Sequence, residues 1–158
     1  MAGFVKNTVA LVVAAIVTYI LAVTAATQSV MASLTDMGVS VSLADRLGTT
    51  LADLSGMFAL FMPLLAIALL LGFLVAAGII RWQPGWRSFG YPLAGFAAVL
   101  VMHLLVTTTT GIHPIAATRS VLGLVLQGLA GAVGGYVFYL VKARADVSSV
   151  PVAGSKTS

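Results

Sequence analysis

The stretch MFALFMPLLAIALLLGFLVAAGII, residues 57–80, decides the fold of this chain. It contains no charged residue, and as an α-helix it would be about 36 Å long, which exceeds the roughly 30 Å of a bilayer's hydrocarbon core. An uninterrupted apolar run of this length is typical of a helix surrounded by lipid. We therefore predict that residues 57–80 cross a membrane.

Three further stretches have the same character, namely residues 8–26, 91–110 and 116–141. Hydrophobic residues make up 60% of the 158 residues and charged residues only 8%, so too little polar surface exists to cover a water-soluble fold of this size. The sequence predicts an all-α membrane protein in which four transmembrane helices form an antiparallel bundle without a β-sheet. We expect one domain over residues 1–142 and a disordered tail over residues 143–158.

The polar stretch 27–55 is predicted to be an outer loop that contains one amphipathic helix, over residues 42–54. Ser42 and Asp45 have the spacing of a capping box, in which each side chain bonds to the backbone of the other residue. An apolar stripe follows at helical spacing, formed by Leu43, Leu47, Leu51 and Leu54. Such a helix is expected to lie on the outer membrane surface or over the end of the bundle.

The first span follows Lys6 and is interpreted as an uncleaved signal anchor. The alternative is a cleavable signal peptide, because Val23, Thr24 and Ala25 before Ala26 resemble the small-residue pattern of a cleavage site. The run is longer than the apolar core of most signal peptides, which favours the anchor.

The distribution of basic residues predicts the orientation. With the N-terminus inside, the cytoplasmic side carries Lys6, Arg81, Arg87, Lys142, Arg144 and Lys156, and the outer side carries only Arg46 and Arg119. This bias follows the positive-inside rule. We expect a multi-pass protein of the bacterial inner (cytoplasmic) membrane with both termini in the cytoplasm.

The composition excludes several classes of chemistry. There is no Cys, so disulfides and thiol catalysis are impossible, and with no Glu the side-chain carboxylates are limited to four Asp, which makes a di-metal carboxylate site implausible. The eight basic residues are scattered at helix ends and form no nucleic-acid patch. We expect no metal, no cofactor and no nucleic-acid partner.

Small residues recur every four positions along three spans, as is typical of closely packed membrane helices. The predicted packing positions are Ala10, Ala14, Thr18, Ala22, Ala68, Gly72, Ala76, Gly123, Gly131 and Gly135. Three interpretations are open: packing within one chain, self-association through the face that carries Gly131 and Gly135, or a solute pathway lined by glycine carbonyls.

Polar residues inside the spans are the other candidates, because ionisable and polar groups are costly in lipid and are often functional. They are His103, Thr107, Gln127 and Arg119. Each also has a structural interpretation: His103 and Gln127 as hydrogen-bonding groups between helices, Thr107 as a group that bonds back to a carbonyl, and Arg119 as a surface partner of Asp53.

Three functional hypotheses follow. The first is a non-enzymatic accessory or self-associating scaffold subunit of a membrane assembly, with the bilayer and a membrane-protein partner or further copies of itself as its contacts. The second is a small-solute or ion transporter or channel, with a polar line through His103, Thr107, Gln127 and Arg119. The third, a membrane enzyme acting on lipid, would depend on His103, His113 and Asp53 as its acid–base groups.

Overall fold

The computed structural model describes residues 2–110, 118 and 120–147. These residues form five α-helices and one short 3₁₀ helix, and no strand occurs among them. The elements are α1 (Ala2–Asp36), α2 (Leu43–Gly56), α3 (Phe58–Trp82), η1 (Pro84–Trp86), α4 (Arg87–Thr110) and α5 (Val121–Val147). Four of the helices, α1, α3, α4 and α5, are long and apolar enough to cross a membrane. The protein is therefore an all-α membrane protein, and the predicted fold class is confirmed.

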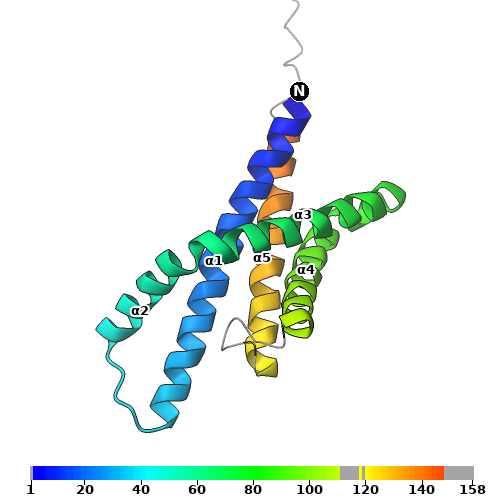
Figure 1. The fold of residues 1–158 in the computed structure, drawn as a ribbon. Coiled ribbons are helices and arrows are strands. Elements are labelled where there is room, and N and C mark those ends of the chain that lie inside the picture. Colours follow the sequence, from blue (N-terminus) through cyan, green and yellow to red (C-terminus); the bar gives the residue numbers. More distant parts are fainter. Residues whose placement is uncertain (1, 111–117, 119, 148–158) are drawn as a thin grey trace, which may run out of the picture.

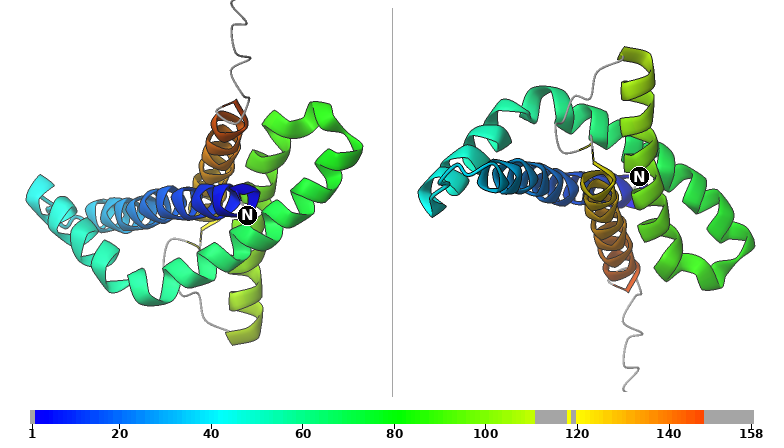
Figure 2. Two further views of the ribbon diagram at one scale, coloured as in Figure 1. Left: turned by 90° about the horizontal axis from the view of Figure 1, so that it is seen from above. Right: turned by 90° about the horizontal axis from the view of Figure 1, so that it is seen from below.

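The helices are arranged so that the first and last spans are neighbours. Helix α5 packs between α1 and α4, antiparallel to both, and α3 packs along α4 and crosses α1 (Figure 1). Helices α2 and α3 follow one another along a curved path on one side of α1, and the chain turns back at η1 into α4 (Figure 2). Both ends of the described chain lie at the same end of the molecule, and we call this the η1 end and the opposite one the α2 end.

The core lies where α1, α5 and α4 meet and extends to the inner face of α3. In the most apolar stretches of α1 and α5, 44% of the residues are buried within the chain, against 22% in α3 and 28% in α4. Helices α3 and α4 therefore leave the larger share of their apolar surface to lipid or to a partner.

Helix α1 corrects the prediction that a loop begins at residue 27, because it continues through Asp36. The hydroxyls of Ser29, Ser33 and Thr35 each donate a hydrogen bond to the carbonyl four residues earlier. Polar side chains that bond to their own helix in this way need not interrupt it. The polar composition of residues 27–36 therefore marks the end of the apolar surface and not the end of the helix.

The end of α1 is set by Gly38, whose φ of +85° few other residues adopt without strain. The amide of Gly38 donates to the carbonyl of Thr35, and the amide of Val39 donates to that of Leu34. These two bonds form a Schellman motif, which satisfies carbonyls at the end of the helix. The chain then turns toward α2.

The last span also differs from the prediction. Helix α5 begins at Val121, later than residue 116, and continues to Val147, so that residues 143–147 are helical and are not part of a disordered tail. Ala143 and Arg144 favour a helix, and the positive charge of Arg144 in the last turn is favourable at the negative end of the helix dipole. The rest of the predicted tail, residues 148–158, lies outside the described residues.

Candidate functional site

Helices α4 and α5 meet backbone to backbone at two glycines. A Cβ atom built on Gly131 would collide with the carbonyl oxygen of Gly95, and one built on Gly95 would collide with the carbonyl oxygen of Gly131. One turn further along α5, a Cβ on Gly135 would collide with the carbonyl oxygen of Tyr91. The contact requires glycine at these positions because a backbone atom on the facing helix cannot rotate away as a side chain can.

A neighbouring face of α5 packs closely against α1. A Cβ on Gly134 would collide with the hydroxyl oxygen of Thr18, which in turn donates a hydrogen bond of 2.8 Å to the carbonyl of Ala14. Both α1 side chains are completely buried. Helix α5 is therefore held between α1 and α4 by small residues on two of its faces.

The remaining predicted packing positions are distributed over the bundle. Ala10, Ala22, Ala76 and Gly123 are buried, whereas Ala68 and Gly72 are half-buried. A Cβ on Gly72 would lie 2.8 Å from that of Ala98, so this glycine allows α3 to approach α4. Gly95 is missing from the predicted set, although a glycine four residues after Tyr91 in an apolar span has the same spacing as those on α5.

Gln127 connects two helices that are distant in the sequence. Its side chain is completely buried, and its Nε2 donates a hydrogen bond of 2.9 Å to the carbonyl oxygen of Ala22 on α1. Its Oε1 is buried and has no hydrogen-bond partner among the described residues. Gln127 therefore has the predicted structural role between helices and retains one unused acceptor.

His103 lies in the interior of the helix bundle and is 2% exposed. Neither of its ring nitrogens has a hydrogen-bond partner within the described part of the chain. The centroid of the imidazole lies 5.9 Å from that of the Phe61 ring. The side chain of Gln127 is its polar neighbour, but the two groups do not meet the geometry of a hydrogen bond. Burial agrees with the prediction that His103 faces other helices, but the hydrogen-bond partner expected for a purely structural histidine is missing.

The structure brings together only part of the polar line predicted for a transporter. His103 and Gln127 are neighbours in the interior, and Thr107 is half-buried one turn from His103 on α4. Arg119 lies outside the described residues, as does His113. A pairing of Arg119 with Asp53 therefore cannot be described, and Asp53 accepts a hydrogen bond of 2.7 Å from the hydroxyl of Thr27.

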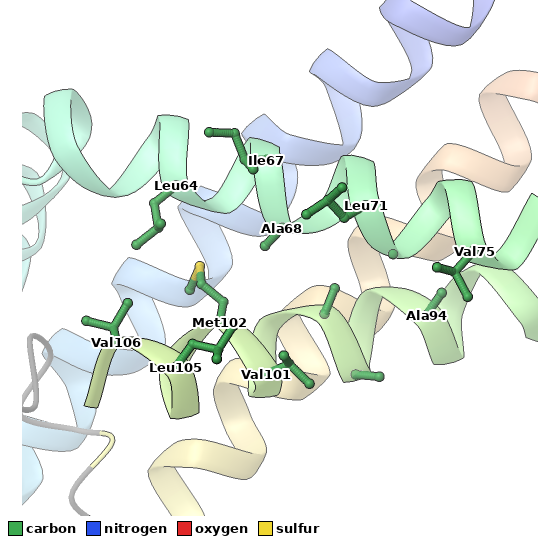
Figure 3. Close-up of a pocket in the computed structure, with 13 residues that line it drawn as sticks. Leu64, Ile67, Ala68, Leu71, Val75, Ala94, Val101, Met102, Leu105 and Val106 are labelled. Atoms are coloured by element: carbon green, nitrogen blue, oxygen red, sulfur yellow. The ribbon is translucent and has the colours of Figure 1, made fainter. Parts of the chain in front are cut away.

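His103 lines a cavity of about 370 Å³ at the α2 end of the groove between α3 and α4. The other described residues that line it are all apolar, and Gln127 and Thr107 are not among them. A second cavity of about 420 Å³ continues along the same two helices and shares Leu64, Met102 and Val106 with the first. Figure 3 shows this second cavity, with Leu64 and Ala68 on α3 pointing toward α4, which contributes Val101, Met102 and Leu105.

A polar surface joins α1 to α2 at the α2 end. Besides the bond between Thr27 and Asp53, Arg46 donates to the side-chain oxygen of Gln28 at 3.0 Å, and Gln28 donates to the hydroxyl of Thr50 at 3.2 Å. The hydroxyl of Tyr19 donates to the carbonyl of Leu54 at 2.6 Å. Helix α2 thus uses its polar face to bind α1.

The start of α2 is fixed by the predicted capping box. The amide of Asp45 donates to the Ser42 hydroxyl oxygen, and the amide of Ser42 donates to the Asp45 carboxylate at 3.0 Å. The hydroxyl and the backbone amide of Ser42 both stabilise the charged carboxylate, and they lower the pKa of Asp45. The predicted box is confirmed.

The apolar stripe of α2 faces away from the remainder of the described chain. Leu43, Leu47 and Leu51 are 74%, 59% and 67% exposed, whereas Leu54 packs against the core. These three leucines lie on one side of a helix outside the four spans. They form an apolar surface whose exposure to water would be unfavourable. We call these three residues the leucine stripe.

The described side chains contain no group of three or more metal-ligating residues. No protein-family model, no curated protein and no solved structure matches this chain. Its function must therefore be argued from the buried polar pair, the cavities and the leucine stripe.

Proposed function

We propose that this chain is a non-enzymatic subunit of a membrane assembly, acting as an accessory component or as a self-associating scaffold. It would reside in a bacterial inner membrane with both termini in the cytoplasm. The observation that supports the proposal most directly is the leucine stripe on α2, which the rest of the described chain leaves uncovered.

The contacts of α2 favour a protein partner for this stripe. Five hydrogen bonds tie α2 to α1. Tyr19, Thr27 and Gln28 of α1 each donate one, and Arg46 of α2 donates two, to Gln28 and to Thr35. Because the polar face is occupied in this way, the direction of the apolar face is fixed before any partner arrives. A surface that is already rigid loses less conformational freedom on binding, so it suits stable association.

The interior supports the same proposal. The small residues on both faces of α5 are used in contacts with α1 and α4, and Gln127 donates its hydrogen bond to α1. These groups stabilise one arrangement of three helices, as a structural subunit requires. Self-association through Gly131 and Gly135 is not needed to explain the glycines, because α4 already covers them.

The proposal can be tested by extracting the protein from its native membrane into nanodiscs and measuring copy number and partners by mass spectrometry. We expect a stoichiometric complex for the wild type, and its loss in the Leu47→Ser and Leu51→Ser variants. Leu93→Ser is the matched control, because Leu93 is a 62% exposed leucine on α4. Helical content measured by circular dichroism should be the same in all four proteins.

Two results would contradict the proposal. One is a wild-type protein that is monomeric and has no stoichiometric protein partner. The other is an assembly that survives both substitutions in the leucine stripe, which would mean that the stripe lies only on lipid.

The transporter alternative is supported by the neighbouring positions of His103 and Gln127 inside the spans. It requires a polar route, whereas the cavity beside His103 is otherwise lined by apolar residues. Solute flux into proteoliposomes that is abolished by Gln127→Leu without loss of folding would favour this alternative over the first.

A further inference from the structure

The groove between α3 and α4 combines an apolar wall with one buried polar group that lacks a partner. The two adjoining cavities have volumes of about 370 and 420 Å³, and His103 lines the one at the α2 end. We propose that this groove binds a neutral lipid with a hydroxyl head, whose O–H donates a hydrogen bond to the imidazole of His103.

The donors and acceptors of the buried pair determine the chemistry of the head group. A neutral imidazole has one N–H donor and one acceptor nitrogen, and the amide oxygen of Gln127 is a further acceptor without a partner. A small movement would let the N–H of His103 bond to the neighbouring Gln127 oxygen. One acceptor nitrogen then remains, and only a ligand that brings a donor can satisfy it.

The described surroundings disfavour a charged head. Residues that line the cavity beside His103 include Phe61, Leu64 and Met102, and none of the described lining residues carries a formal charge when His103 is neutral. A phosphate or an ammonium group would lose its hydration there without gaining an opposite charge. A hydroxyl loses much less hydration, and the single bond to His103 replaces what it loses.

Water is also a poorer occupant of this cavity than a lipid. A buried water needs two to four polar partners to be held in place. Among the described residues that line this cavity, His103 has the only polar side chain, so water would find too few partners there.

The length of the groove fits one hydrocarbon chain. Its lining extends from Leu64 to Val75 on α3, a rise of about 16 Å along the helix. This is close to half of the roughly 30 Å hydrocarbon core, and therefore to the depth of one leaflet. When such a ligand moves from the bilayer into the groove, contacts with the apolar side chains on both walls, shown in Figure 3, would replace its contacts with other lipid chains.

The test uses two probes that differ in one position, where a methyl group replaces the hydroxyl hydrogen and so removes the donor. The first is hexadecanol that carries a photoactivatable diazirine and an alkyne in its chain, and the second is the methyl ether of the same molecule. Full-length protein in phosphatidylcholine nanodiscs is irradiated with each probe, and labelled peptides are identified by mass spectrometry. We expect the alcohol to label residues on both walls of the groove about tenfold more strongly than the ether, since one hydrogen bond is lost.

Substitutions show whether His103 and the groove are responsible. His103→Leu should reduce labelling by the alcohol to the level of the ether, and His103→Gln, which keeps an acceptor, should restore part of it. Ala97→Phe should block the groove, because Ala97 lines it, whereas Leu104→Phe, at a 62% exposed position outside the lining, should leave labelling unchanged.

Three results would overturn the proposal. The alcohol and the ether could label equally, which would show that the hydroxyl is not recognised. Labelling could spread evenly over all lipid-facing helices, or it could persist at full strength in both His103→Leu and Ala97→Phe. The first result would leave at most an apolar groove that does not recognise the head group, and the other two would identify ordinary bilayer contact.

Discussion

At the scale of single residues, the contact between Gly95 and Gly131 shows how this bundle is held together. In lipid, apolar side chains gain little by leaving one hydrocarbon environment for another, so close packing and hydrogen bonds must stabilise the helix pairs. Glycine allows the closest approach, and here the carbonyl oxygen of each glycine occupies the space that a Cβ on the other would need.

Gly131→Ala is therefore expected to destabilise the fold, even though alanine is intrinsically the better helix former. Overpacking of this kind lowers the free energy of unfolding by about 1–3 kcal/mol. Gly78→Ala is the control, because nothing lies within 4 Å of a Cβ at that helical position. Thermal unfolding in detergent micelles should show a loss only for Gly131→Ala, and an equal effect of both variants would refute the argument.

Contacts between residues of different helices are the part of this structure that the sequence does not predict. The spacing of Gly131 and Gly135 indicates a packing face but not which helix covers it, and Gly95 is found only when the facing helix is known. Likewise, His103 and Gln127 are separate polar residues in the sequence. Their proximity depends on how α4 and α5 are rotated about their axes, which no local pattern specifies.

At the scale of elements, α2 is the helix that local sequence predicts best. The capping box and the leucine spacing both lie within one short segment, so the conformation of this segment depends little on the rest of the chain. Helix α1 is the opposite case, because its polar end is kept helical by hydroxyl bonds that composition alone does not reveal. The structure therefore departs most from the predictions where polar residues continue a helix.

The capping box makes the first turn of α2 sensitive to acid. The pKa of Asp45 is lowered in the folded protein, so the box contributes fully above the ordinary value of 3.8 and is lost as the pH falls through the lower folded value. We expect NMR chemical shifts to report fraying of residues 43–46 as the pH falls below the ordinary value of 3.8.

Two variants test this interpretation. Asp45→Asn should show a frayed first turn at every pH, because the amide is a weaker acceptor than the carboxylate. Asp36→Asn, at the exposed end of α1, should keep the wild-type profile. A pH dependence that persists in Asp45→Asn would show that another group is responsible.

At the scale of the whole molecule, charge is divided between the two ends. The η1 end carries Lys6, Arg81, Arg87, Lys142 and Arg144 against one acidic residue, Asp146 near the end of α5, whereas the α2 end carries Asp36, Asp45 and Asp53 against one described basic residue, Arg46. At the η1 end, Lys142 donates to the hydroxyl of Tyr91 at 3.1 Å and lies 5.3 Å from the centre of its ring. The division supports the proposed orientation, with the η1 end in the cytoplasm.

The absence of Cys from the sequence makes this orientation easy to test. Single cysteines introduced as Ser40→Cys, between α1 and α2, and as Ser88→Cys, at the start of α4, are both exposed. In intact cells a membrane-impermeant maleimide should label only the first, and after permeabilisation it should label both. Labelling of Ser88→Cys in intact cells would show the opposite orientation.

The glycine contact between α4 and α5 also has a genetic consequence. All glycine codons begin with the same two bases, and any missense change in either base introduces a residue that has at least a Cβ atom. At Gly95, Gly131 and Gly135 that atom would enter the backbone of the facing helix. Every amino-acid replacement that one base change can produce at these codons should therefore be harmful, and a saturation mutagenesis screen of expression level would show three depleted positions along the α4–α5 contact.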